Sequence, residues 1–327
     1  MSTAPSKKLY ILALLRKSPD WLSGEAISEE LGISRAAVAK HITTLRAEGY
    51  FIEAVSRRGY LLKMEPDTVD AGLIKKALKT KIIGHGQWAW QEKTGSTNSE
   101  AAALGAAGAP DGSLVLTDLQ TQGRGRRGRK WFSAPRSIQF SVLLRPNLPA
   151  RRLSVLSLLA CLAVHKTLVE LSGAEFAIKW PNDILINAKK VAAVLVEAGI
   201  VGGEIEWAVM GIGCNLNAVR TEFPEELRRI VTSVYEETGR QLARNAVYEK
   251  LLTELDAYYT ALLRHGADPL LAEWKQKTDI VGKTLSLVTR GQIVAGEVMD
   301  LTDDGLLVVR DLAGKEHSIE VGDYTVN

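Results

Sequence analysis

The sequence GRGRRGRKWFSAPRS, residues 123–137, decides which fold the central part of the chain can have. Its first six residues match the G-x-G-x-x-G dinucleotide-binding fingerprint, which must open a helix. Here Pro135 and a strand-like segment follow instead, and three arginines would crowd a bound pyrophosphate. The sequence therefore predicts a flexible cationic loop whose guanidinium groups suit phosphate or carboxylate, with a solvated basic loop as the alternative.

The segments around this loop favour an α+β fold over a doubly wound one. Several strand-like runs are separated only by short turns, which are too short for the crossovers of a parallel sheet. These runs are 113–119, 138–144, 184–186, 191–197 and 205–210. Two long apolar helix candidates, 153–171 and 247–263, are expected to cover the resulting mixed or antiparallel sheet.

The N-terminal residues have the pattern of a winged helix-turn-helix. One helix candidate ends at Gly32, and a second covers residues 34–48, where Val38, Ile42 and Leu45 share one face. Two short strands, 50–55 and 60–63, then predict a β-hairpin wing. In such modules the second helix enters the major groove of DNA.

The predicted DNA-contacting residues lie on the outer face of that second helix and at the tip of the wing. They are Ser34, Arg35, Ala36, Ala39, Lys40, Thr43, Arg57 and Arg58. A small helical domain with a solvated charged face is the alternative interpretation.

The last part of the chain predicts a small all-β unit, of the SH3-like barrel type. From Asp279 onward the chain consists of short strand-like runs with Gly turns, at 284–288, 293–301, 306–311 and 317–321. The predicted domains are therefore a winged helix at 1–65, a central domain at 66–278 and a C-terminal barrel at 279–327.

Composition is that of a folded cytoplasmic protein. Hydrophobic residues make up 46% of the chain and charged residues 24%, with a net charge of only +3. Two cysteines build no disulfide framework, the five histidines are scattered, and no metal site is predicted. The N-terminus lacks a signal peptide and no apolar run reaches about 18 residues, so we expect no membrane segment.

Three further segments are unusually polar for a core. They are STN at 96–98, KWPND at 179–183 with Lys190 seven residues on, and GIGCN at 211–215. With Gln120 and the cationic loop, they resemble the biotin-protein ligase family in order and character. GISRAAV at 32–38 and AGEV at 295–298 resemble the winged helix and the C-terminal barrel of the ligases that also repress biotin synthesis.

The resemblance implies a class II synthetase-like central domain and a role for each matching residue. Lys190, Arg124 and Arg126 are expected to be catalytic. Biotin is expected to contact these three residues and Ser96, Thr97, Asn98, Gln120 and Gly125, while the adenylate side is expected to use Arg127, Trp131, Asn182, Asp183, Gly211, Gly213 and Asn215. The family usually has Gly at the position of Ala193, whose methyl group is expected to trim the biotin pocket.

The implied substrates are ATP and biotin, with Mg²⁺ expected from the ATP chemistry. The implied partners are a biotin carboxyl carrier protein (an acetyl-CoA carboxylase subunit), operator DNA and, once loaded with biotinyl-5'-AMP, a second copy of the chain. Two alternatives are a ligand-sensing transcription factor with an inactive ligase domain and a lipoate-type ligase.

Overall fold

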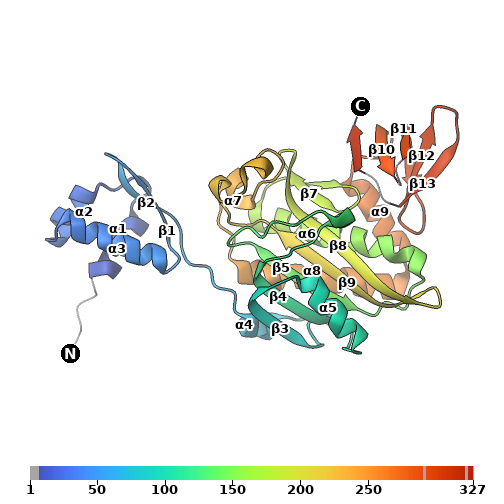
Figure 1. The fold of residues 1–327 in the computed structure, drawn as a ribbon, viewed down its shortest axis with the longest axis horizontal. Helices are drawn as coiled ribbons and strands as arrows, with labels where there is room; N and C mark the ends of the chain where they lie inside the picture. The colour runs from blue at the N-terminus through green and yellow to red at the C-terminus, as the bar shows by residue number, and fades with distance from the viewer. Residues whose placement is uncertain (1–6, 290–291, 321–322, 327) are drawn as a thin grey trace. The chain divides into compact units, whose positions relative to one another are not determined.

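The computed structural model describes residues 7–289, 292–320 and 323–326, and it divides into two compact units, Met1–Thr68 and Val69–Asn327. The first unit contains α1 (Lys7–Lys17), α2 (Gly24–Leu31), α3 (Arg35–Ala47) and the hairpin of β1 (Phe51–Val55) and β2 (Gly59–Met64) (Figure 1). The predicted winged helix-turn-helix is thereby confirmed.

The turn between α2 and α3 has the backbone geometry that its residues favour. Gly32 adopts a left-handed conformation with φ of 59°, and Ser34 caps α3 by accepting a hydrogen bond from the backbone N–H of Ala37 at 3.1 Å. The predicted apolar face of α3, Val38, Ile42 and Leu45, is buried against α1 and α2. Its opposite face therefore stays free for a ligand.

The second unit is built on a seven-stranded sheet in the order β3-β4-β5-β9-β8-β7-β6. Its strands are β3 (Trp88–Thr94), β4 (Ser113–Gln120), β5 (Ile138–Leu144), β6 (Ala177–Lys179), β7 (Asp183–Ile186), β8 (Lys189–Val201) and β9 (Glu204–Cys214). Only β3 and β4 pair in parallel, and every other neighbouring pair is antiparallel. The sheet is mixed, as predicted.

Strand β3 and helix α5 (Thr97–Ala106), which connects it to β4, are not apparent from the sequence pattern. Strand β3 lies at the edge of the sheet, and most of its side chains are exposed or half-buried on both faces. An edge strand of this kind lacks the alternation of apolar and polar residues by which strands are recognised.

Helices cover both faces of the sheet. The long helices α6 (Leu153–Ser172) and α8 (Arg244–His265) pack in the main core, while α5 packs through Ala101 on a separate cluster with Val115, Leu143 and Val209. Helix α6 is long and apolar enough to cross a membrane, but 61% of its apolar window is buried, so it is the core helix of this unit. The shorter helices are α4 (Ala71–Ala77), α7 (Val234–Thr238) and α9 (Asp268–Lys277).

The C-terminal strands form a five-stranded antiparallel sheet in the order β13-β12-β11-β10-β14. They are β10 (Thr284–Thr289), β11 (Gln292–Leu301), β12 (Leu307–Asp311), β13 (Glu316–Ile319) and β14 (Asp323–Val326). The predicted all-β unit is confirmed, although the sheet is open rather than a closed barrel, and the predicted strand end at Val321 lies outside the described residues. Its buried Leu285, Leu287 and Val298 share one core with the central sheet.

Candidate active site

A cavity of about 760 Å³ opens above the central sheet, and it is lined by residues from segments far apart in the sequence. This volume suits a drug-sized or nucleotide-sized ligand. Fourteen of the fifteen predicted ligand-binding residues line it: Ser96, Thr97, Asn98, Gln120, Arg124, Gly125, Arg126, Trp131, Asn182, Asp183, Lys190, Gly211, Gly213 and Asn215. The exception is Arg127, whose Nη2 donates to the backbone carbonyl of Val288 in β10 at 3.1 Å.

The start of α5 and the end of β4 meet on one wall of the cavity. Gln120 Oε1 accepts a hydrogen bond from the backbone N–H of Thr97 at 2.9 Å and one from Thr97 Oγ1 at 3.2 Å. Ser96 stands at the N-terminus of α5 without capping it through its side chain, and its hydroxyl lines the cavity. This wall offers neutral hydrogen-bonding groups, which suit an uncharged polar ligand group.

Asn98, predicted to bind biotin, has most of its hydrogen bonds inside the protein. Its Oδ1 accepts from Ser141 Oγ at 2.7 Å, and its Nδ2 donates to Leu195 O at 3.3 Å and to Glu197 Oε2 at 2.7 Å. The same Glu197 oxygen lies 2.8 Å from Arg124 Nη2. Asn98 thus links the wall of the cavity to the first arginine of the cationic loop.

The loop turns back on itself and carries its arginines to different partners. The backbone N–H of Gly125 donates to Arg129 O at 2.7 Å, and Arg127 takes a left-handed conformation with φ of 55°. Arg126 Nη1 donates to Asn182 Oδ1 at 3.2 Å, and Asn182 Nδ2 donates to Val194 O at 2.6 Å. The KWPND segment therefore holds the loop over the cavity.

Lys190 also lines the cavity, where the hairpin of β7 and β8 brings it beside the KWPND segment. Its Nζ lies 2.6 Å from Asp183 Oδ2, and its backbone N–H donates to Ile230 O at 2.9 Å. Both side chains remain partly exposed, so the ammonium group can reach a ligand. Cations from two segments, the loop and the start of β8, thus line the cavity, which suits a reaction between two anionic groups.

Two glycines of the GIGCN segment are required by close packing. A Cβ atom on Gly211 would lie 1.9 Å from Asn98 Oδ1, and one on Gly213 would lie 2.5 Å from the Trp131 indole ring. Any side chain at either position would displace a predicted site residue. The sequence signal was the pair of glycines at the end of an apolar strand.

Two buried polar atoms beside the cavity have no hydrogen-bond partner among the described residues: Trp131 Nε1 and Asn215 Oδ1. Buried polar groups are rarely left unpaired. One is a donor and the other an acceptor, so a heterocycle with both kinds of group, such as adenine, could pair with them.

A cysteine nucleophile is excluded at this site. Cys161 lies beneath the KWPND segment, with its Sγ 4.0 Å from Pro181 O. Burial raises the pKa of its thiol far above the usual range, Asp183 raises it further, and Arg126 only partly opposes the effect. The thiol therefore stays protonated and inert.

In the N-terminal unit, all eight predicted DNA-contacting residues are exposed. Six lie at the cap or along the outer face of α3, and Arg57 and Arg58 lie in the turn between β1 and β2. The Arg58 guanidinium carbon sits 4.7 Å from the centre of the Trp21 ring, a cation–π contact that orients the wing tip.

Sequence reasoning missed four polar residues that hold the site together: Ser133, Gln139, Ser141 and Glu197. A signal was present for two of them, because Gln139 and Ser141 occupy alternate positions of the otherwise apolar strand at 138–144. Alternate positions share one face of a strand, so two buried polar residues there indicate a polar network.

Comparison with known proteins agrees with this geometry. Residues 91–215 match the model of the biotin/lipoate A/B protein ligase family, and residues 7–61 match the model of an HTH domain. The chain is 36% identical to the bifunctional ligase/repressor BirA of Bacillus spizizenii over 296 residues, 90% of this chain and 91% of that protein. It is 30% identical to BirA of Escherichia coli, over 94% and 92% of the two chains.

Among solved structures, the chain is similar to the biotin protein ligase of Aquifex aeolicus in complex with biotin and ATP. The TM-score is 0.62 at 28% identity, over 74% of this chain and 98% of that chain. With the winged helix and the cavity described above, these matches show that the chain belongs to the biotin-protein ligase family. Within that family it falls among the bifunctional ligase/repressors.

Proposed function

We propose that the chain activates biotin with ATP in the cavity between the cationic loop and Lys190, and transfers it to a lysine of a biotin carboxyl carrier protein. A biotin carboxylate oxygen attacks the α-phosphorus of ATP, and pyrophosphate leaves. The amine of the carrier lysine then attacks the acyl carbon of biotinyl-5'-AMP, which forms an amide and releases AMP. The observation that carries this proposal is that Arg124 and Arg126 of the loop and Lys190 of β8 line one cavity of suitable volume.

The neutral wall is assigned to the ureido ring of biotin. Ser96, Thr97 and Gln120 supply hydroxyl and amide groups, and the backbone of Gly125 lies beside them in the cavity lining. A neutral cyclic urea needs matched donors and acceptors rather than charge. Asn98 supports this wall through its bonds to Ser141 and Glu197.

The cations are assigned to the reacting groups. Bringing a carboxylate to a triphosphate sets negative charges against each other, so fixed positive charges must lower the barrier. Arg124 and Arg126 bind carboxylate and phosphate, and Lys190 stabilises the charge that develops at the α-phosphate. The loop then covers the mixed anhydride and excludes water.

The adenine is assigned to the region of Trp131 and Asn215, where the two unpartnered polar atoms lie. Gly211 and Gly213 permit its close approach to the backbone. Arg127, by contrast, is bonded to Val288, and we assign it to the anchoring of the loop on β10. Asn182 anchors Arg126 at the other side of the loop.

Asp183 is the one carboxylate among the described residues that line the cavity. Magnesium in nucleotide sites typically takes one or two carboxylates together with phosphate oxygens. Asp183 therefore fits as the protein ligand of a Mg²⁺ ion, which when bound would neutralise phosphate charge.

Regulation is assigned to the winged helix. We propose that biotinyl-5'-AMP acts as corepressor, that the loaded chain dimerises through its central sheet, and that the dimer binds a palindromic operator. The exposed outer face of α3 and the edge position of β3 support this proposal. Sedimentation with and without biotin and ATP tests it: an unchanged monomer under both conditions would contradict the dimer.

The activity is tested by incubation with ATP, biotin and a purified carrier domain, followed by intact mass measurement. We expect the carrier to gain one biotinyl group. Replacement of biotin by lipoate distinguishes the lipoate-type alternative, since only a lipoate ligase would then modify its carrier. An unmodified carrier with both acids, over several Mg²⁺ concentrations, would favour the non-enzymatic sensor.

A further inference from the structure

Gln139 lies directly behind the cavity wall without reaching the cavity. It belongs to β5, its side chain is fully buried, and it is absent from the residues that line the cavity. Its Oε1 accepts hydrogen bonds from Ser133 Oγ and from Gln120 Nε2, the latter at 3.4 Å, and its Nε2 donates to Asp118 O at 3.4 Å. Burial of an amide is costly unless its groups are paired, and here both ends are paired.

These contacts fix which end of the Gln120 amide faces which neighbour. The backbone N–H of Thr97 can only donate, so the atom 2.9 Å from it must be the oxygen of Gln120. The nitrogen of Gln120 therefore faces Gln139 Oε1. With its oxygen bound twice by Thr97 and one N–H bound by Gln139, Gln120 keeps one N–H for a ligand.

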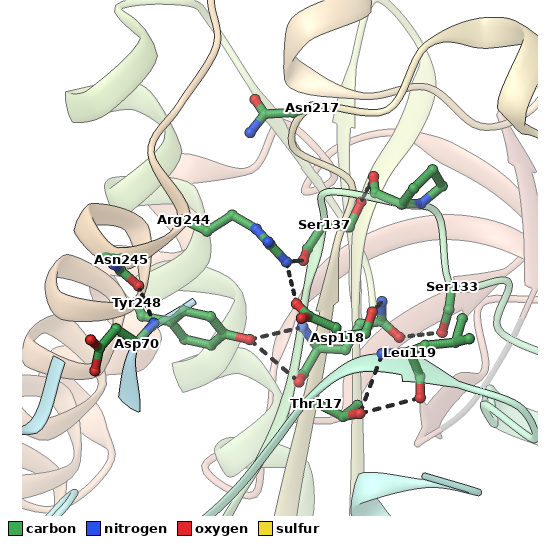
Figure 2. Close-up of polar contacts among 12 residues, drawn as sticks. Asp70, Thr117, Asp118, Leu119, Ser133, Ser137, Asn217, Arg244, Asn245 and Tyr248 are labelled. Carbon is green, nitrogen blue, oxygen red and sulfur yellow. Dashed lines mark hydrogen bonds and ion pairs between the residues drawn. The ribbon is translucent and has the colours of Figure 1, made fainter. Parts of the chain in front are cut away.

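Gln139 is itself held from the core side. Its backbone N–H donates to Tyr248 Oη at 3.3 Å, and Arg244 makes an ion pair with Asp118, whose carbonyl receives the Gln139 amide. Figure 2 shows Arg244 and Tyr248 reaching from α8 toward Asp118 and Ser137. Ser133 makes a second contact with Gln120: its Oγ accepts a hydrogen bond from the backbone N–H of Gln120 at 3.1 Å.

We propose that Gln139, with Ser133, is a positioning residue that fixes the orientation of the Gln120 amide and so sets the affinity for the ureido group of biotin. This inference rests on the proposed function, because it assigns Gln120 to biotin. The effect is expected on biotin alone, because the amide that Gln139 contacts belongs to Gln120, whereas adenine is assigned to Trp131 Nε1 and Asn215 Oδ1. The competing explanation is that Gln139 is a core residue that only stabilises the fold.

The test measures biotin binding by calorimetry, without ATP, for Gln139→Leu, Gln120→Ala and the double variant. Loss of one orienting hydrogen bond predicts a biotin Kd raised about fivefold to tenfold in Gln139→Leu. Steady-state kinetics should show the same rise in the KM for biotin, with kcat and the KM for ATP within about twofold. In the Gln120→Ala background, Gln139→Leu should change the Kd no further, because its effect passes through Gln120.

Ser113→Ala is the matched control, since Ser113 is a fully buried polar residue at the other end of β4, bonded to Gln87 and Pro110. It should leave the biotin Kd unchanged. Three results would overturn the inference. They are an unchanged biotin Kd in Gln139→Leu, a loss of biotin affinity from Gln139→Leu that is the same with and without Gln120→Ala, and a rise in the KM for ATP equal to that for biotin. Should Gln139→Leu not fold, Ser133→Ala decides, with an expected rise of about twofold to fourfold.

The proposed function is tested separately by the wild-type protein. A wild-type chain that binds no biotin overturns the proposed function and this inference with it. A wild-type chain that binds biotin, together with an unaffected Gln139→Leu variant, overturns the inference alone.

Discussion

Arg124 Nη2 lies 2.8 Å from Glu197 Oε2, and the same oxygen accepts a hydrogen bond from Asn98 Nδ2 at 2.7 Å. The first arginine of the cationic loop is therefore tied to β8 by a carboxylate that does not line the cavity. Both side chains of the ion pair are substantially exposed, so its contribution to stability is small. Its consequence is for binding, because a ligand carboxylate must compete with Glu197 for Arg124.

We predict that Glu197→Gln raises biotin affinity about twofold to fivefold, since the amide oxygen still accepts from Asn98 but no longer carries the negative charge that competes for Arg124. The unfolding free energy should change by less than about 1 kcal/mol. Glu316→Gln, which removes a similarly exposed ion pair with Arg310 in the C-terminal sheet, is the control. Calorimetric titration with biotin measures both variants, and weaker binding in Glu197→Gln would disprove the competition.

Lys190→Ala should lower the rate of carrier biotinylation about 100-fold to 1,000-fold, because a fixed cation at the developing charge is lost. Lys189→Ala is the matched control, since Lys189 Nζ binds Glu237 at 3.0 Å and Lys189 is not among the residues that line the cavity. Pyrophosphate release measures the adenylation step directly. A wild-type rate in Lys190→Ala would refute its assignment.

Gly211→Ala should weaken biotin binding and lower the unfolding free energy by about 1–3 kcal/mol, because the new methyl group would force Asn98 out of its place. Gly95→Ala is the control, as a Cβ there meets nothing within 4 Å. Thermal unfolding with and without biotin separates the two effects. Stability equal to that of the wild type would show that Asn98 moves without cost.

The lowered pKa of Glu254 predicts how the stability of the fold depends on pH. Burial alone would raise its pKa, but hydrogen bonds from Lys250 at 2.7 Å and Lys166 at 2.9 Å outweigh burial and lower it. A lowered pKa stabilises the fold above the pKa of an unfolded glutamate, about 4.3, and this contribution disappears as pH falls through the folded value.

Glu254→Gln should therefore destabilise the protein by about 1 kcal/mol at pH 7, and by progressively less below about pH 4. Denaturant unfolding of both proteins from pH 3 to pH 8 measures the difference. A difference that stays constant over this range would contradict the lowered pKa.

The winged helix predicts a salt-dependent contact with DNA. Arg35→Ala combined with Lys40→Ala should weaken binding to a duplex that the wild-type protein selects from a random library. The slope of log K against log salt concentration should fall in magnitude by about 2, one unit for each phosphate contact. Lys7→Ala with Lys8→Ala removes the same charge from α1. An equal loss of DNA affinity in that variant would show that binding depends on net charge and not on the outer face of α3.

The local architecture could be predicted from the sequence wherever a single element carries its own signal. Ser34 caps α3, Gly32 ends α2, and the apolar face of α3 follows from helical spacing. The cationic loop could be separated from a Rossmann turn because Pro135 and a strand follow it. Strand β3 could not be predicted, because an exposed edge strand has no apolar periodicity.

The residues available to the site can be read from the sequence: a glycine-rich basic loop, a lysine after KWPND, and glycines ending a strand. Which of these residues contact one another depends on how the chain folds. In the folded chain, Gln139 lies behind Gln120 and Arg124 pairs with Glu197. Arg127 bonds to Val288 of β10 and is not among the residues that line the cavity. The physical reason is that these contacts join residues up to 161 positions apart, through pairing and packing of distant elements that no local pattern encodes.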